Sequence, residues 1–408
     1  MSDKTTNTSI MEEAARLFGK AKVEKLSRLG HDFIEAGGDG SWLLDTNGNR
    51  MLDAYTSGGV FNLGRRHPEL VEELRLAMRE TDQGNFPMIS KEKATLGQML
   101  SEFVDDGLEC AIYSVIRGET VEAACKIARG YTGRKKLLSV EGAYHGEMGF
   151  GVSLSTRKDK DLFGALIPET EIIAYGDLEA AEKAIDSDTA ALIIEPLQVE
   201  NGVRKAEAVY IEGLRELCTN NGALLIFDET QSGFGRCGTR FAYKNTKAQP
   251  DMLIVGEALG GGLFPIAATM LTQKVNSFLN SHPLIHLSTF GGSDIGCRVA
   301  KKALEIYLRE KPWKNAKNQG EYLSGKLQDI ATANSQTIKS VKACGLALSL
   351  KLSDKTNVEG FCKKLAAARV LAMPGKVMTN SVLLRPSLLL NRDEADFLVE
   401  AIGKAASV

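Results

Sequence analysis

The chain has 408 residues, of which 43% are hydrophobic and 25% charged, with a net charge of −2. This is ordinary globular composition, and the near-neutral balance argues against nucleic acid or an anionic membrane as the main partner. The amino terminus "MSDKTTNTS" lacks the layout of a signal peptide, and no apolar run approaches the roughly 18 residues of a membrane-spanning helix. Seven scattered cysteines give neither a disulfide framework nor a metal motif, so we expect free thiols in the cytoplasm.

The first eighty residues predict two helices around a hairpin. Residues 9–28 show the periodicity of an amphipathic helix. The segment 40–55 predicts a β-hairpin, because Asn47-Gly48 supplies turn residues that tolerate positive φ. Residues 67–80 predict a helix with Pro68 near its first turn.

From about residue 93, short apolar strands alternate with helices, which predicts a mostly parallel central sheet wrapped by helices, an α/β fold. After Gly292 a helix over 294–310 leads to a segment that predicts a smaller α+β domain. We therefore expect an N-terminal segment (1–50) that packs with the small domain, a large ligand-binding domain (51–300) and a small domain (301–408). The expected strands are 110–115, 136–140, 170–176, 190–196, 223–229, 252–255, 341–352, 370–374 and 381–390, and the expected helices are 93–105, 118–130, 177–185, 209–221, 315–331, 357–366 and 392–406.

Polar residues follow several of these strands, and ligands of parallel α/β sheets gather at the carboxyl ends of the strands. The helix expected at 118 would also offer an anion site, since its free N–H groups point outward. The segments that carry these residues are "AYHGE", "IIEPLQVENG", "LLIFDETQSGFGR", "SVIRGET" and "HLSTFGGSD".

Together with the turn "PDMLIVGEALGGG", these segments occur in the order and at about the spacing seen in one family. From about residue 30 to the carboxyl terminus the chain resembles the class III aminotransferases, which are fold-type I pyridoxal phosphate enzymes. That group includes ornithine and acetylornithine aminotransferases and glutamate semialdehyde aminomutase. The resemblance implies the PLP-dependent transferase fold of type I, a small-molecule substrate and a homodimer.

The resemblance also implies how the coenzyme is held. Asp228 would pair with the pyridine nitrogen and keep the ring protonated. Tyr144 would stack on the ring face and Gln231 would lie near the ring oxygen. Thr289, offered by the partner subunit, would hydrogen-bond the phosphate, so the sites would be shared across the dimer interface.

The phosphate-binding segment departs from the family pattern "SG(T/A)E". Here it contains Ile116, Arg117, Gly118 and Glu119, so a hydroxyl is missing and an arginine replaces a glycine. Gly118 and Glu119 keep their expected places in the cofactor site. Arg117 could bind an anion through its planar fork of donors, or equally fill the cup and exclude the phosphate.

The larger departure is Glu257, which stands 29 positions after Asp228, where the family carries its Schiff-base lysine. A carboxylate cannot form an imine, so the covalent resting state of ordinary transamination is lost. Lys274, the nearest lysine downstream, lies beyond the GGG turn and is a poor substitute. A carboxylate at this place can still act as a proton-transfer base.

The small domain departs as well. Ornithine-type members carry a substrate-binding arginine where this chain has Leu383, and an arginine appears two residues later as Arg385. A shift of two keeps the same strand face but moves the group by roughly 7 Å. We take Arg385, its expected partner Glu200, Arg117 and His145 as candidate substrate-binding residues.

Three hypotheses follow. The first is an enzyme that binds pyridoxal or pyridoxamine phosphate non-covalently and acts on a small amino or keto acid with Glu257 as the base. The second is a cofactor-independent acid–base enzyme that reuses the pocket. The third is a catalytically silent protein that binds a metabolite or pairs with an active homologue. No metal site is expected, and the sequence names no substrate.

Overall fold

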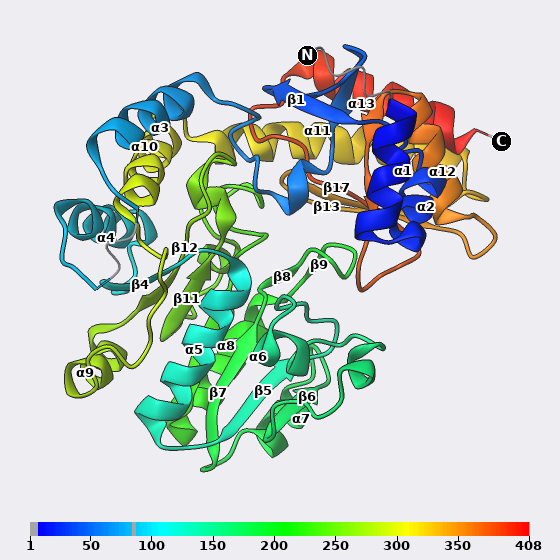
Figure 1. Ribbon diagram of the computed structural model, residues 1–408. Helices are drawn as coiled ribbons and strands as arrows, with labels where there is room; N and C mark the ends of the chain where they lie inside the picture. The colour runs from blue at the N-terminus through cyan, green and yellow to red at the C-terminus, as the bar shows by residue number, and fades with distance from the viewer. Residues whose placement is uncertain (1–6, 84–86, 408) are drawn as a thin grey trace.

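The computed structural model describes residues 7–83 and 87–407 (Figure 1). Its centre is a seven-stranded sheet in the order β4-β12-β11-β10-β7-β5-β6. Six of these strands run in one direction and β12 runs against them, which confirms the predicted mostly parallel sheet. The strands are β4 (Cys110–Ser114), β5 (Lys136–Val140), β6 (Thr170–Ile173), β7 (Thr189–Ile194), β10 (Leu224–Asp228), β11 (Met252–Val255) and β12 (Ala267–Leu271).

Helices cover this sheet because its central strands are apolar along their whole length and must be buried on both faces. Every residue of β7, β10, β11 and β12 is buried. Of the helices within the described residues, none combines the length and apolar character that crossing a membrane requires. The helices of this part are α3 (Pro68–Glu80), α4 (Lys91–Val104), α5 (Arg117–Thr132), α6 (Gly149–Ser153), α7 (Leu178–Ala184), α8 (Ala208–Asn221), α9 (Gln273–Ser281) and α10 (Asp294–Glu310).

The amino-terminal segment joins the carboxyl-terminal part of the chain (Figure 1). Strands β1 (Glu35–Asp39), β2 (Trp42–Asp45) and β3 (Arg50–Asp53) form a sheet whose fourth strand is β15 (Val370–Leu371). The predicted hairpin is therefore present as β2 and β3. The helix predicted over 9–28 is two helices, α1 (Asn7–Phe18) and α2 (Lys20–Arg28), because Gly19 adopts a φ of 99° between them.

The carboxyl-terminal part forms an antiparallel sheet of β13 (Ile338–Cys344), β14 (Ala347–Leu352), β17 (Ser381–Leu384) and β16 (Met373–Pro374). The strand predicted over 341–352 is a hairpin, and Gly345 turns it with a φ of 56°. The strand predicted from Ser381 ends at Leu384. The division of the chain at residues 50 and 300 stays a prediction. The helices here are α11 (Pro312–Ala333), α12 (Val358–Ala367) and α13 (Arg392–Ala406).

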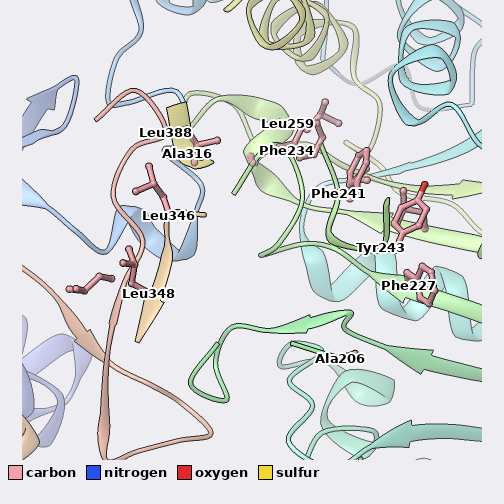
Figure 2. Packing of buried hydrophobic residues seen from close by; sticks show 14 of the residues in the cluster. Ala206, Phe227, Phe234, Phe241, Tyr243, Leu259, Ala316, Leu346, Leu348 and Leu388 are labelled. Carbon is pink, nitrogen blue, oxygen red and sulfur yellow. The ribbon is translucent and has the colours of Figure 1, made fainter. Parts of the chain in front are cut away.

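The "SGFGR" segment connects the large sheet to this smaller part. Figure 2 shows Phe234, Phe241 and Tyr243 on one side of the junction and Leu346, Leu348 and Leu388 on the other. Arg236 is fully buried between them and donates hydrogen bonds to the carbonyl oxygens of Leu346 (2.9 Å) and Pro386 (2.6 Å). Packing thus accounts for this segment, in addition to any role that it has in binding.

Candidate active site

Two acids lie together at the carboxyl edge of the central sheet. Asp228 is the last residue of β10, and Glu195 directly follows β7, its parallel neighbour. The side chains lie close because parallel neighbours end at the same edge. Both are almost completely buried, at 1% and 2% exposure. Two carboxyl groups in so little water require a cation or a proton.

Arg117 supplies the cation. It is the first residue of α5, and its Nη2 lies 2.7 Å from Oδ2 of Asp228 and 3.4 Å from Oε1 of Glu195. The same nitrogen donates to the carbonyl oxygen of Tyr144, and the guanidinium stands over the Tyr144 ring, 5.0 Å from its centroid. With only 6% of its surface exposed, Arg117 points into the protein. Its place at the start of α5 directs the side chain towards Asp228. The sequence alone did not show whether the side chain points into the protein or towards a bound anion.

His145 holds the same carboxylate from another side. Its Nδ1 lies 2.9 Å from Oδ2 of Asp228, and the ring is completely buried. Burial lowers the pKa of His145, so the neutral ring donates its Nδ1 proton to Asp228. Burial alone would raise the pKa of Asp228, but the attraction of Arg117 and the hydrogen bonds hold it well below the usual range. Asp228 is therefore an anion paired with Arg117.

The pKa of Glu195 is shifted in the opposite direction from that of Asp228. Burial raises the pKa of Glu195 to about 8, although Arg117 attracts its charge and the backbone N–H of Tyr144 donates to its Oε2 at 2.9 Å. At neutral pH the described side chains of this cluster then comprise one carboxylate, Asp228, one guanidinium, Arg117, and a protonated acid, Glu195. The charges of Asp228 and Arg117 offset one another.

A second buried ion pair lies nearby. Nη1 of Arg385 lies 2.7 Å from Oε1 of Glu200 and 2.8 Å from Oε1 of Gln231, and Gln231 donates back to Glu200 at 3.2 Å. The attraction and hydrogen bonds of Arg385 outweigh burial and lower the pKa of Glu200. Nε of Arg385 is buried and has no hydrogen-bond partner within the described residues. One donor of this guanidinium is thus left for a ligand.

Glu257 begins the 3-10 helix η4 (Glu257–Gly260), two residues after β11 ends. Because β11 is the parallel neighbour of β10, with Ile254 opposite Asp228, the backbone of Glu257 lies at the same sheet edge as the two acids. The side chain of Glu257 lies outside what the structure describes. Gly256 must be glycine here, since a Cβ would approach Cγ2 of Thr230 to 2.3 Å.

The remaining predicted cofactor residues lie around α5. Gly118 is buried in its first turn, and the carboxylate of Glu119 accepts the backbone N–H of Val115 at 2.7 Å. Thr289 is exposed, in the segment between α9 and α10. Their contacts with a cofactor stay predictions.

Sequence reasoning missed Lys376. It follows β16, and its Nζ contacts the hydroxyl of Tyr144 and lies 4.4 Å from the centre of that ring. These residues border a cavity of about 740 Å³ between residues 143–159 and residues 373–379. Nothing in the local sequence marks this lysine, because only the tertiary fold brings it to Tyr144.

A family model described as "Aminotransferase class-III" matches residues 30–406. The chain belongs to the class III aminotransferase family. The match confirms the fold type and the resemblance seen in the sequence, and members of this family use pyridoxal or pyridoxamine phosphate.

Two relatives and two structures illustrate the family. An uncharacterized aminotransferase of Archaeoglobus fulgidus is 34% identical over 98% of this chain and 94% of the relative. A putrescine aminotransferase of Pectobacterium atrosepticum is 32% identical over 86% of this chain and 77% of the relative. The ornithine aminotransferase of Toxoplasma gondii superposes with a TM-score of 0.92 at 25% identity, covering 99% and 96% of the two chains. An amine transaminase from an uncultivated Pseudomonas species, in its PLP-bound internal aldimine form, gives 0.84 at 26% identity, covering 91% and 94%.

The residues of this class III aminotransferase do not fit the coenzyme ring as they stand. The resemblance assigns Asp228 to the pyridine nitrogen, but Oδ2 of Asp228 already receives Arg117 and His145, and Oδ1 accepts the backbone N–H of Thr230 at 3.1 Å. The guanidinium also takes a place over the Tyr144 ring. A ring stacked on Tyr144 and bonded to Asp228 would have to displace Arg117.

Proposed function

We propose that this chain is a class III aminotransferase-family enzyme that acts on a small amino or keto acid by acid–base chemistry, without a covalently held cofactor. One observation carries the proposal: the Arg117 guanidinium is bonded to Asp228, the partner that the family resemblance assigns to the coenzyme ring. As long as Arg117 and Asp228 remain paired, the protein's own side chains have to carry out the proton transfer.

Glu257 is the proposed proton-transfer group. Its backbone position at the edge shared with Asp228 and Glu195 supports this role. A carboxylate in this place takes a proton from the substrate carbon beside the carbonyl or amino group and returns it to the product. Partial burial would bring the pKa of such a group towards neutrality, as acid–base catalysis requires.

Arg385 is the proposed receptor for the substrate carboxylate. It is almost completely buried, it already holds one carboxylate, Glu200, and its Nε is left without a partner in the described part of the chain. A bound carboxylate that uses Nε and Nη2 together, which lie on one edge of the guanidinium, would form the bidentate pair that arginine favours. Glu200 would then be an internal anion that competes with the substrate carboxylate for the charge of Arg385.

The test compares wild type with Glu257→Gln and Glu257→Lys on candidate amino and keto acids, first without any added cofactor. We expect Glu257→Gln to lose activity by about 10²- to 10⁴-fold, the usual contribution of a general base. Glu305→Gln, a surface control, should change nothing. Unchanged turnover in Glu257→Gln would overturn the assignment, and activity gained only in Glu257→Lys with pyridoxal phosphate would favour a silent protein.

A second candidate has its own support. Tyr144, Asp228 and Gln231, which the resemblance assigns to the coenzyme, are all present in this chain, and it belongs to a family that uses pyridoxal phosphate. Under this alternative the enzyme binds pyridoxal or pyridoxamine phosphate non-covalently, and Arg117 has to leave Asp228 first. Turnover that depends on added cofactor, with no adduct on any lysine, would establish it in place of the first candidate.

The assembly and location are also proposals. We infer a homodimer, because Thr289 is exposed beside Ile285, Leu287 and Phe290, each about half exposed. A contiguous apolar segment of this kind is typical of an interface. The unpaired state of all seven cysteines supports the cytoplasm. Mass measurement in solution and cell fractionation test the two statements.

A further inference from the structure

We infer that Arg117 is a built-in occupant of the coenzyme-ring subsite, a planar cation that excludes pyridoxal and pyridoxamine phosphate from this protein. The inference deepens the proposed function, because it names the residue that keeps the cofactor out. It rests on the contacts of Arg117 and not on the role of Glu257.

Arg117 meets the requirements that a protonated pyridine ring would meet. It is planar and cationic, it donates to Oδ2 of Asp228 at 2.7 Å, and it lies over the Tyr144 ring at 5.0 Å. A guanidinium both pairs with carboxylates and stacks on aromatic faces. The buried charge of Asp228 is therefore compensated by the chain itself.

Arg117 is hard to displace from Asp228 because it belongs to α5, a helix that packs against the central sheet. Arg117 is the first residue of α5, which packs against β4, β7, β11 and β12, so its side chain is presented to Asp228 at a high effective concentration. A competing ring would also remove Arg117 from Glu195 and from the carbonyl oxygen of Tyr144. Arg117 would then need new partners for a charge that is now almost entirely buried.

A ring paired with Asp228 has to take the place of the Arg117 side chain, which now donates to Oδ2 of that carboxylate. On its other side the helix start is closely packed, since a Cβ on Gly118 would lie 2.6 Å from Sδ of Met148. Removing the guanidinium leaves Asp228 hydrogen-bonded to His145 but without its cation. A small planar cation with a phosphate group, such as pyridoxamine phosphate, is the class of ligand that would restore the charge balance.

The experiment measures binding of pyridoxamine phosphate, which carries an amine and so forms no imine with surface lysines. Absorbance titration and thermal shift are recorded for wild type, Arg117→Gly, Arg117→Lys and the double variant Arg117→Gly with Asp228→Asn. We expect no saturable binding by wild type up to about 1 mM, and binding at least about tenfold tighter by Arg117→Gly, with a raised melting temperature. Arg117→Lys keeps a cation beside Asp228, so we expect it to bind pyridoxamine phosphate no better than wild type. The double variant lacks the carboxylate that pairs with the ring, so it should bind no better than wild type either.

Saturable binding of pyridoxamine phosphate to wild type at micromolar concentration would overturn the inference, as would an Arg117→Gly protein that folds and binds no better than wild type. Should the glycine variant fail to fold, Arg117→Ala removes the guanidinium but keeps a good helix former at the start of α5, and it must still bind more tightly than wild type. Cofactor-free turnover lost in Glu257→Gln would leave the proposed function standing even if Arg117 proved not to be the barrier.

Discussion

The two buried arginine–carboxylate pairs of the site have the same length, 2.7 Å, but connect different parts of the molecule. Arg117 and Asp228 join α5 to β10 within one sheet-and-helix layer. Arg385 and Glu200 join the segment after β17 of the small sheet to the segment after β8 (Leu197–Gln198), which pairs with β9 (Arg204–Lys205). The first pair therefore lies within one sheet-and-helix layer, and the second bridges two sheets.

The difference shows how one chemical pair can serve two purposes. Arg117 has Asp228, Glu195 and the Tyr144 carbonyl oxygen as partners, so exchanging a ligand for it breaks several contacts at once. Arg385 keeps a buried Nε that no described residue accepts. We infer that a ligand does not replace Asp228 as the partner of Arg117, whereas a substrate carboxylate can bind to Arg385. The following changes test that contrast.

Asp228→Asn should have the largest effect. The amide keeps the shape but leaves Arg117 buried without its counter-charge, and breaking a buried pair in this way costs about 3 to 5 kcal/mol of unfolding free energy. Urea denaturation measures the loss. Glu69→Gln, which breaks the exposed pair with Arg309, is the control and should stay within about 1 kcal/mol. A loss at Asp228 no larger than at Glu69 would mean that the first pair is not a fixed one.

Glu195→Gln should change how stability depends on pH. Glu195 has a folded pKa of about 8 against an ordinary value of 4.5, so the native state holds its proton more tightly than the unfolded state. The stabilisation that comes from this tighter proton binding is complete below about pH 4.5 and is lost as the pH rises to about 8. Because glutamine does not titrate, the unfolding free energy of the variant relative to that of wild type should rise by on the order of 4 kcal/mol between pH 5 and pH 9. Parallel stability curves for the two proteins would contradict this account.

Glu200→Gln should have the smallest effect. It weakens the internal competitor for Arg385, so a small carboxylate such as acetate or a keto acid should bind about tenfold more tightly, which corresponds to about 1.4 kcal/mol. Calorimetric titration measures the affinity. Equal affinities in variant and wild type would show that the second pair is as closed as the first.

The sequence predicted the sheet well, because buried strands of four to six apolar residues alternate with amphipathic helices. It did not predict β12, which follows the glycine-rich turn, or the turn at Gly345 inside an apolar run. It selected Arg117, His145 and Asp228 as separate candidates, but it gave no direction for Arg117. That direction depends on burial and on three partners that are distant in the chain. The contact between Lys376 and Tyr144 likewise joins residues that are distant in the chain, so the sequence could not show it.

The most direct measurement is a crystal structure of the wild-type protein after soaking with pyridoxamine phosphate. The account predicts that the Arg117 guanidinium still lies on Asp228 and over the Tyr144 ring, with no pyridine ring beside them. A ring stacked on Tyr144, with its nitrogen on Asp228 and Arg117 turned away, would contradict the account and establish a non-covalent vitamin B6 enzyme in its place.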